Sequence, residues 1–280
     1  MKSNNLNLYC ITHKYFKFLE NLNLKIIVGG SYYNKSKFPK KWLLDKTKKN
    51  IAKKNINYET LTSIYWIWKN EIKKYNKNDW IGICHYRRFW LKKKLNKKIY
   101  PNNLKRNLLN FIPSKDLKFN AFVLSPQNVS GHKLVKMLKK TKRNIIKNPA
   151  ILFNKKLHTI NLHFDMFHIH NGLIKAASVM PKKDRSEFLN YINTETKFFP
   201  FNLFILKKDK FNLMCNDIFK WIFKCEKFFN LKKLKGYGQT RIFAFIIERY
   251  ISYWIIKNSN YKILPGVFID PLGEKPSNNI

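Results

Sequence analysis

The sequence predicts an α/β fold, and two kinds of local pattern support that prediction. Short apolar runs at residues 6–11, 24–28 and 80–84 have the length and composition of buried strands. Between the second and third runs, apolar residues recur at three- and four-residue steps, which predicts an amphipathic helix; they are Leu61, Ile64, Tyr65, Trp68, Ile72 and Tyr75. Strands and helices in this order are typical of a sheet flanked by helices.

The first two strands end in distinct polar or flexible residues. Residues 6–11 run into Thr12-His13-Lys14, and residues 24–28 run into Gly29-Gly30. A glycine pair after a strand predicts a turn with positive φ, and the alternative, a phosphate-binding loop, is only weakly indicated. Residues 31–57 are basic and poorly periodic, which predicts a long loop with one helical turn.

The strand at 80–84 is followed directly by His85, Tyr86, Arg87 and Arg88. Ligands of open α/β sheets bind at the carboxyl ends of strands, so this polar cluster is a candidate site. Guanidinium groups bind phosphate oxygens in pairs, and His85 could donate a hydrogen bond or act as a base near pH 7. The alternative is an internal polar cluster that ties the strand end to Glu248.

The second half of the chain is mostly helical in pattern. Helices are predicted at 133–147, 173–180, 184–192, 210–229 and 239–257, and strands at 120–124 and 198–206. In the first helix Leu134, Met137, Leu138 and Ile145 are expected to face inward, and Asp184 is a candidate cap of the third. Without a clear linker, residues 1–265 are expected to form one domain, with 266–280 as a surface tail.

Residues 158–172 contain most of the histidines of the chain. His158, His163, Asp165, His168 and His170 could form a metal site if the segment were a strand, whereas the alternative is an entry into the following helix. The chain contains no His-Glu-x-x-His or Asp-x-Asp motif, and its four cysteines form no Cys-x-x-Cys pair. No metal site is therefore assigned, and metal dependence stays open.

The net charge of +40 is the most unusual feature of the composition. Lys, Asn, Ile, Phe and Tyr are abundant together, which is typical of an AT-rich genome. A surface this basic is still attracted to anionic membranes.

The cysteines are expected to be reduced thiols of a cytosolic protein. No signal peptide is expected, and the longest apolar run, 242–256, is interrupted by Glu248 and Arg249.

Two motifs carry a resemblance to a known family. Residues 61–70, with Tyr-Trp-Ile-Trp-Lys-Asn, and residues 84–88, Cys-His-Tyr-Arg-Arg, resemble bacterial glycosyltransferase-like proteins of capsular-polysaccharide and lipopolysaccharide gene clusters. That family was long catalogued as a domain of unknown function. The resemblance extends over residues 6–257, and it implies one Rossmann-like sheet of the GT-A type with a helical C-terminal part.

The resemblance also implies a function. It implies transfer of a hexose, such as galactofuranose or galactose, from a nucleotide sugar (a UDP-sugar is favoured) to a surface-polysaccharide or lipooligosaccharide acceptor. The implied donor- and diphosphate-binding residues are His13, Tyr86, Arg87, Arg88, Asn202 and Arg241, and the implied catalytic residues are His85, Asp165 and Glu248. The expected location is the cytoplasm, with peripheral contact to an anionic inner membrane.

The alternative is a basic membrane-surface or nucleic-acid-binding protein without enzymatic activity. No specific nucleic-acid partner is expected, because no nucleic-acid-binding motif is present and Lys is spread along the whole chain.

Overall fold

The computed structural model describes residues 5–131 and 134–280, and the chain divides into two compact units. Unit 1 comprises Met1–Ser125, Phe201–Cys215 and Ile255–Ile280, and unit 2 comprises Pro126–Pro200 and Asn216–Trp254. Because α8 (Lys208–Cys225) and α10 (Ile242–Asn258) each run across a unit boundary, the two units share helices. The expectation of a single domain over 1–265 stays a prediction.

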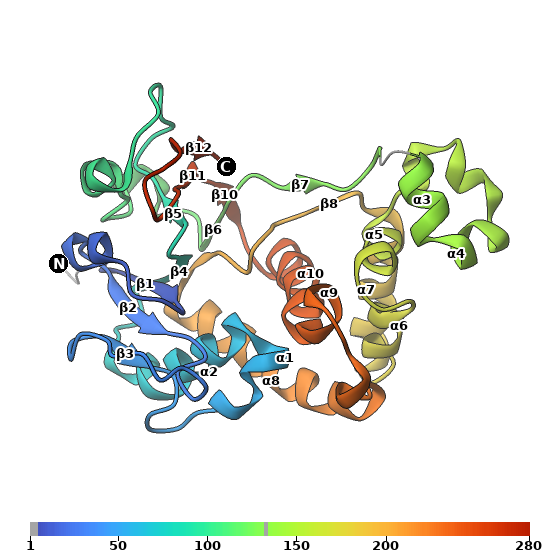
Figure 1. Cartoon of the computed structure of the whole chain (residues 1–280), viewed down its shortest axis with the longest axis horizontal. Helices are drawn as coiled ribbons and strands as arrows, with labels where there is room; N and C mark the ends of the chain where they lie inside the picture. The colour runs from blue at the N-terminus through green and yellow to red at the C-terminus, as the bar shows by residue number, and fades with distance from the viewer. Residues whose placement is uncertain (1–4, 132–133) are drawn as a thin grey trace. The chain divides into compact units, whose positions relative to one another are not determined.

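Unit 1 is built on a mixed sheet whose central strands are mostly parallel (Figure 1). Its strands are β1 (Leu6–Thr12), β2 (Lys25–Val28), β3 (Leu43–Leu44), β4 (Trp80–His85), β5 (Arg88–Trp90), β6 (Ala121–Val123), β9 (Ile205–Lys207), β10 (Tyr261–Ile263), β11 (Gly266–Phe268) and β12 (Asn278–Asn279). The main order is β10-β6-β9-β4-β1-β2-β3. Strands β4, β1, β2 and β3 run parallel, and β9 is antiparallel to both neighbours. The predicted Rossmann-like sheet flanked by helices is thus confirmed.

The helices of unit 1 pack against this sheet. They are α1 (Asn55–Tyr58), α2 (Thr60–Asn70) and the start of α8, with 3-10 turns η1 (Lys17–Asn21), η2 (Ala52–Lys54), η3 (Ile72–Lys74), η4 (Pro101–Asn103), η5 (Lys105–Asn107) and η6 (Ser114–Asp116). Leu61 and Ile64 are fully buried, as the apolar spacing predicts. Trp68 of α2 donates to Asn212 of α8 at 2.8 Å, so the two helices lie side by side.

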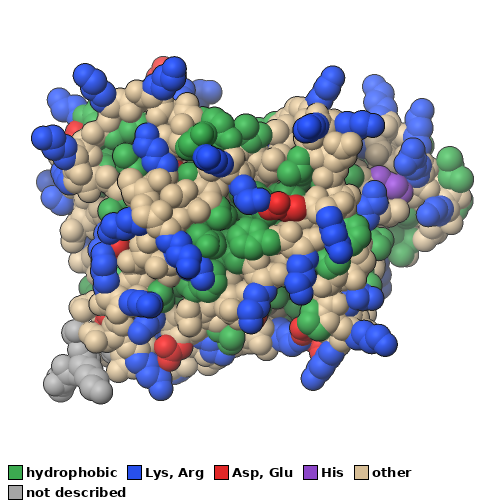
Figure 2. All heavy atoms as spheres, turned by 90° about the horizontal axis from the view of Figure 1, so that it is seen from below, with side chains coloured by type: hydrophobic (Ala, Val, Ile, Leu, Met, Phe, Trp, Pro, Cys, Tyr) green, Lys and Arg blue, Asp and Glu red, His purple; other side chains and the backbone are tan. Residues whose placement is uncertain are grey.

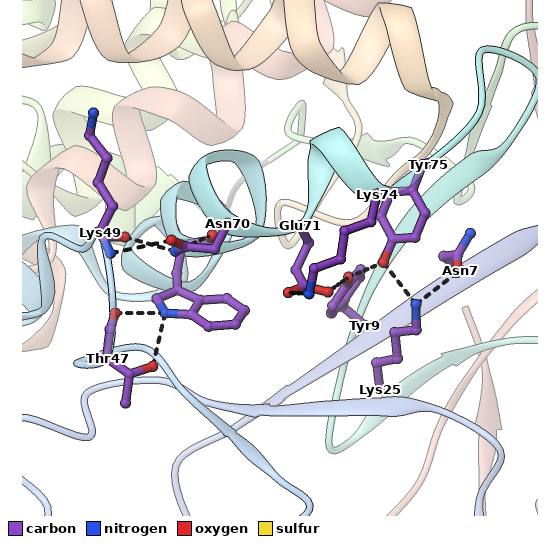
Figure 3. A network of polar contacts seen from close by, with 10 residues as sticks. Asn7, Tyr9, Lys25, Thr47, Lys49, Asn70, Glu71, Lys74 and Tyr75 are labelled. Atoms are coloured by element: carbon purple, nitrogen blue, oxygen red, sulfur yellow. Dashed lines mark hydrogen bonds and ion pairs between the residues drawn. The ribbon is translucent and has the colours of Figure 1, made fainter.

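A polar network fixes the end of α2 to the first two strands (Figure 3). The Tyr9 hydroxyl of β1 hydrogen-bonds Tyr75 and donates to Glu71 at 3.3 Å. Lys25 of β2 donates to the Tyr75 hydroxyl at 2.8 Å, and Lys74 donates to Glu71 at 2.5 Å. Helix α2 ends at Asn70, and the chain turns through η3 before it enters β4. The network holds this turn against β1 and β2.

Some segments of unit 1 differ in detail from the expectation. The segment 31–57 leads into one helical turn, α1, as expected, and adds the short strand β3, while Gly266–Phe268 form β11, which pairs with β5. The strand expected at 198–206 is interrupted, because Phe201 and Asn202 both have positive φ, 75° and 54°. Only β9 belongs to the sheet of unit 1.

Unit 2 is mainly helical, as the sequence predicts for the C-terminal part. It contains α3 (Leu134–Lys140), α4 (Lys142–Lys147), α5 (Ile160–Phe167), α6 (Gly172–Ala177), α7 (Lys182–Thr194), α9 (Tyr237–Thr240), most of α8 and α10, η7 (Pro149–Leu152), η8 (Lys155–Leu157), η9 (Glu226–Phe228) and η10 (Leu231–Lys233). The strands β7 (Gln127–Asn128) and β8 (Lys197–Phe198) form a small antiparallel pair.

Three expectations for unit 2 are corrected. The helix expected at 133–147 breaks at Thr141, whose hydroxyl donates to the Met137 carbonyl at 2.8 Å, and Leu138 is exposed rather than inward. Pro181 rather than Asp184 precedes α7 as its N-cap. The side chain of Leu134 lies outside the described residues. For the histidine-rich segment the helical alternative applies, because α5 begins at Ile160 and α6 begins at Gly172.

The four cysteines are buried thiols, as expected. Within the described part of the chain, no helix combines the length and the apolar character that a membrane span requires.

Candidate site at the carboxyl ends of the parallel strands

The strand register of unit 1 brings the predicted polar cluster to one edge of the sheet. Ile11 of β1 lies opposite His85 of β4, and Thr12 lies opposite Val28 of β2, so the three carboxyl ends are level. Strand β9 runs the other way, and the Ile83 amide donates to the Phe204 carbonyl at 2.9 Å. The residues just before β9 therefore reach the edge at which β4 ends.

Arg88 is held at this edge by aromatic rings. Its guanidinium carbon lies 3.9 Å from the centre of the Phe201 ring and 5.5 Å from that of Phe268. Cation–π contacts of this kind orient the guanidinium plane. Phe201 and Asn202 adopt a left-handed backbone that costs a non-glycine residue free energy, and such strain gathers at functional sites. Asn202 is 6% exposed, so this predicted donor-binding residue is largely buried.

His85 lies in a short chain of polar groups. Its Nε2 is 3.4 Å from the Thr60 hydroxyl, which itself donates to the Glu59 carboxylate. Glu59 also accepts from the Thr60 amide at 2.5 Å and so caps α2, with backbone angles φ 48° and ψ −122°. The fold thus brings the Glu59 carboxylate beside the end of β4.

The ionisation of His85 follows from its surroundings. Burial lowers the pKa of His85 to about 4, since the charged ring would lose its hydration; the Glu59 carboxylate opposes this shift and the Arg88 guanidinium adds to it. The ring is therefore neutral at pH 7. A neutral imidazole donates through one nitrogen and accepts through the other, which favours a hydrogen-bonding role over that of a base near pH 7.

Aromatic rings gather around Tyr86 at the same edge. The rings of Tyr86 and Phe16 are stacked with 5.2 Å between centres, and His13 meets Tyr86 edge-on at 5.0 Å. The Nε of Arg87 donates to the Tyr86 hydroxyl at 2.7 Å. His13 and Arg87 are exposed, so this part of the edge offers a flat ring and an accessible guanidinium to a ligand.

Asp45 is a residue of this region that sequence reasoning missed. It is fully buried and accepts from the Gly30 amide at 2.9 Å, the Ser31 amide at 3.0 Å and the Thr62 hydroxyl at 2.6 Å. Gly30 has φ 69°, which confirms the predicted turn with positive φ. Asp45 ties this turn to α2, and as the only acidic residue between 31 and 57 it could have been noticed in the sequence.

In unit 2, Asp165 lies in a fully satisfied position. It is 7% exposed and accepts from the Asn171 amide at 2.8 Å, the Asn144 side chain at 2.9 Å and His170 Nδ1 at 3.0 Å. Since both carboxylate oxygens are engaged, Asp165 orients the ring of His170, whose side chain is 25% exposed.

The other described histidines of the segment have structural contacts. His158 Nε2 contacts the Ile151 carbonyl at 2.9 Å, His163 contacts buried Arg249 at 3.3 Å, and His168 is stacked on Phe245. Within residues 5–131 and 134–280, no three His, Cys, Asp or Glu side chains are grouped as metal ligands would be.

Arg241 and Glu248 also lie in unit 2. The Arg241 guanidinium covers the Tyr237 ring at 4.4 Å, while Glu248 forms an ion pair with its neighbour Arg249. Burial lowers the pKa of Arg249, and the Glu248 carboxylate opposes that shift. The ion pair thus stabilises a charge that would otherwise be costly to bury.

Comparison with known proteins gives one family. Residues 7–259 match the family described as "Domain of unknown function (DUF4422)". The chain belongs to this family. The match covers all of unit 2 and most of unit 1, and it leaves out residues 1–6 and 260–280. No curated protein matches the chain significantly.

A solved structure is similar to the fold of this family member. It is the apo structure of WbbM, a bifunctional glycosyltransferase, with a TM-score of 0.66 and 18% sequence identity over 98% of this chain. The chain spans 46% of the length of that protein. At 18% identity the similarity shows that the two proteins share a fold. The fold of this chain is therefore one that a glycosyltransferase also adopts.

Proposed function

We propose that this protein is a glycosyltransferase that takes its sugar from a nucleotide-sugar donor. The observation that carries the proposal is the group of cationic and aromatic side chains at the carboxyl edge of the parallel strands, where α/β sheets bind ligands. The similarity of the fold to that of a glycosyltransferase supports the same reaction class.

The proposed reaction needs two kinds of group. The acceptor hydroxyl loses its proton and its oxygen bonds to the anomeric carbon, while the bond from that carbon to the diphosphate breaks and the electron pair leaves on the phosphate. Arg87 and Arg88 are proposed to neutralise the leaving diphosphate, because guanidinium groups bind phosphate oxygens bidentately. His13, Tyr86 and Asn202 are proposed as further donor contacts, and Arg241 is proposed from the resemblance alone.

The catalytic residues proposed from the resemblance take separate roles. Neutral His85 is suited to donate a hydrogen bond to a developing negative charge. Asp165 is suited to position His170 as a proton acceptor, in the way that a carboxylate orients the base of a catalytic dyad. Glu248 is the third candidate, and it also stabilises Arg249.

The finer proposal follows the resemblance. The donor is proposed to be a UDP-hexose such as UDP-galactofuranose or UDP-galactose, and the acceptor a surface polysaccharide or lipooligosaccharide. Such acceptors are assembled at the cytoplasmic side of the inner membrane, so the protein is proposed to work there in peripheral contact with anionic lipid.

Calorimetric titration with UDP at 0.15 M salt, with and without Mn²⁺, tests the proposal. Arg88→Ala and Arg87→Ala are each expected to weaken binding about tenfold or more, since a charge-assisted hydrogen bond contributes about 1.5–3 kcal/mol. Arg106→Ala is the matched control, because Arg106 is an exposed arginine of unit 1 in η5.

The outcomes separate the possible functions. Saturable UDP binding that depends on Arg88 supports the donor site, and a requirement for Mn²⁺ adds a metal to it. If UDP, GDP, CMP and dTDP all fail to bind, the glycosyltransferase proposal is wrong and the protein acts without a nucleotide.

A further inference from the structure

The most exposed large apolar side chains in the described part of the chain lie close together in the sequence of unit 2. Phe153, just after η7, is 85% exposed and Ile146 of α4 is 79% exposed. Leu138 of α3 is 47% exposed. Large apolar side chains are stabilised when a partner removes them from water. Their exposure in this segment therefore indicates an interaction surface.

These residues are not misplaced core residues, because the core of this region is already filled. Met137 and Ile151 are buried together with Leu162 and Met166 of α5, and Ile145 packs against them. Ile145 and Ile146 are neighbours in the chain, yet one packs inward and the other faces outward. Leu138, Ile146 and Phe153 therefore stay exposed on a segment whose inward side chains already form a packed cluster.

The same segment is uniformly basic. Residues 134–157 contain eight Lys or Arg and no Asp or Glu, and the first acidic residue after Asp116 is Asp165. Lys142, Arg143 and Lys147 of α4 are exposed. At the end of unit 2 that carries α3 and α4 (right-hand edge of Figure 2), hydrophobic side chains are seen with Lys and Arg beside them.

We propose that α3, α4 and η7 form a membrane-docking surface that binds anionic phospholipid bilayers. Apolar side chains on short helices insert into the boundary between head groups and acyl chains, and the lysines around them attract anionic head groups. Nucleic acid would also be attracted by the basic residues. It would offer no comparable contact to Ile146, which has no ring to stack on a base. The surface goes beyond the proposed reaction, because lipid binding requires neither donor nor acceptor.

Co-sedimentation of the full chain with vesicles at 0.15 M salt measures this binding. Vesicles of phosphatidylcholine with a third of phosphatidylglycerol are expected to bind the protein, and pure phosphatidylcholine much less. The double variant Ile146→Ser/Phe153→Ser is expected to lose about tenfold in partition. Leu272→Ser, at an apolar residue of unit 1 that is 71% exposed, is the matched control and should bind as the wild type does.

Charge is tested in the same way. Lys142→Glu/Arg143→Glu should weaken the partition about 25-fold or more, since one basic residue near the surface contributes about fivefold. Lys93→Glu/Lys94→Glu, a pair of exposed lysines in unit 1, makes the same change in net charge elsewhere. If both charge variants lose binding equally, the attraction belongs to the net charge and the assigned surface is wrong.

Insertion itself has a direct readout. All four native cysteines are buried, so a cysteine introduced as Ile146→Cys can be labelled selectively with a polarity-sensitive fluorophore. Anionic vesicles should shift its emission to the blue, while the label on Leu272→Cys should not respond. A shift with double-stranded oligonucleotide instead of vesicles would overturn the proposal in favour of nucleic acid. UDP titration of the same variants measures donor binding, so the test of membrane docking and the test of the proposed reaction can fail independently.

Discussion

A half-buried histidine of unit 2, His168, should make the protein sensitive to acid. His168 Nδ1 donates to the Gly238 carbonyl at 2.7 Å, and the ring is stacked on Phe245 with 4.0 Å between centres. Burial lowers the pKa of His168 to about 3, the nearby Arg249 charge lowers it further, and the Gly238 carbonyl opposes the shift. The folded protein therefore keeps this ring neutral well below pH 6, where the unfolded chain would protonate it.

The sign and size of the effect follow from proton linkage. Between pH 6.5 and pH 3 the unfolded chain binds one proton more than the folded chain at His168, so the free energy of unfolding falls as the pH falls. With a pKa of about 6.5 when unfolded and about 3 when folded, going from pH 7 to pH 4.5 costs about 2.5 kcal/mol at this one residue. The full contribution is present at pH 7.

Urea unfolding of wild type and His168→Gln at pH 7 and pH 4.5 measures this term. Glutamine stays neutral throughout, so the variant is expected to be less stable at pH 7, where it loses the ring contacts. It should then lose about 2.5 kcal/mol less than the wild type on acidification. His13→Gln, at an exposed histidine of unit 1, is the control and should follow the wild type. An equal loss in His168→Gln and wild type would refute the reasoning.

Two further predictions concern Asp45, which has a structural role, and His170, which is the partner of the Asp165 carboxylate. Asp45→Ala leaves the Gly30 and Ser31 amides and the Thr62 hydroxyl without this acceptor and should lower the free energy of unfolding, measured in urea, by about 3 kcal/mol. Unchanged stability would mean that the turn holds without Asp45. His170→Ala should lower kcat about 100-fold with UDP affinity unchanged, and added imidazole should restore part of the rate. Full activity of that variant would remove His170 from the proposed mechanism.

Much of unit 1 could be predicted because its signals are local. The apolar runs of β1, β2 and β4 and the spacing in α2 depend on neighbouring residues, and a strand followed by polar residues directs attention to the carboxyl edge of the sheet. Asp45 was missed because its role depends on partners in two other segments, the Gly30-Ser31 turn and Thr62 of α2. The donor-binding and catalytic roles of the edge residues stay predictions.

The segments that were less predictable depend on local geometry that apolar spacing does not report. In the segment 133–147 the backbone of Thr141 leaves the helical region, with φ −127° and ψ 28°, so α3 and α4 are separate helices. In the segment 158–172 Thr159 caps α5 by accepting from the Leu162 amide, and α6 begins at Gly172, which agrees with the alternative of a helix entry.

The strained backbone beside His85 is an argument for function. Glu59, Phe201 and Asn202 each hold positive φ without being glycine, and such positions cost about 1–3 kcal/mol each. A chain selected for stability alone would favour glycine there, which adopts positive φ without strain. The side chains that glycine would remove are the Glu59 carboxylate that binds Thr60 beside His85 and the Phe201 ring that holds Arg88. The strain is thus best explained by a need for these groups at the carboxyl edge, which is where the donor is proposed to bind.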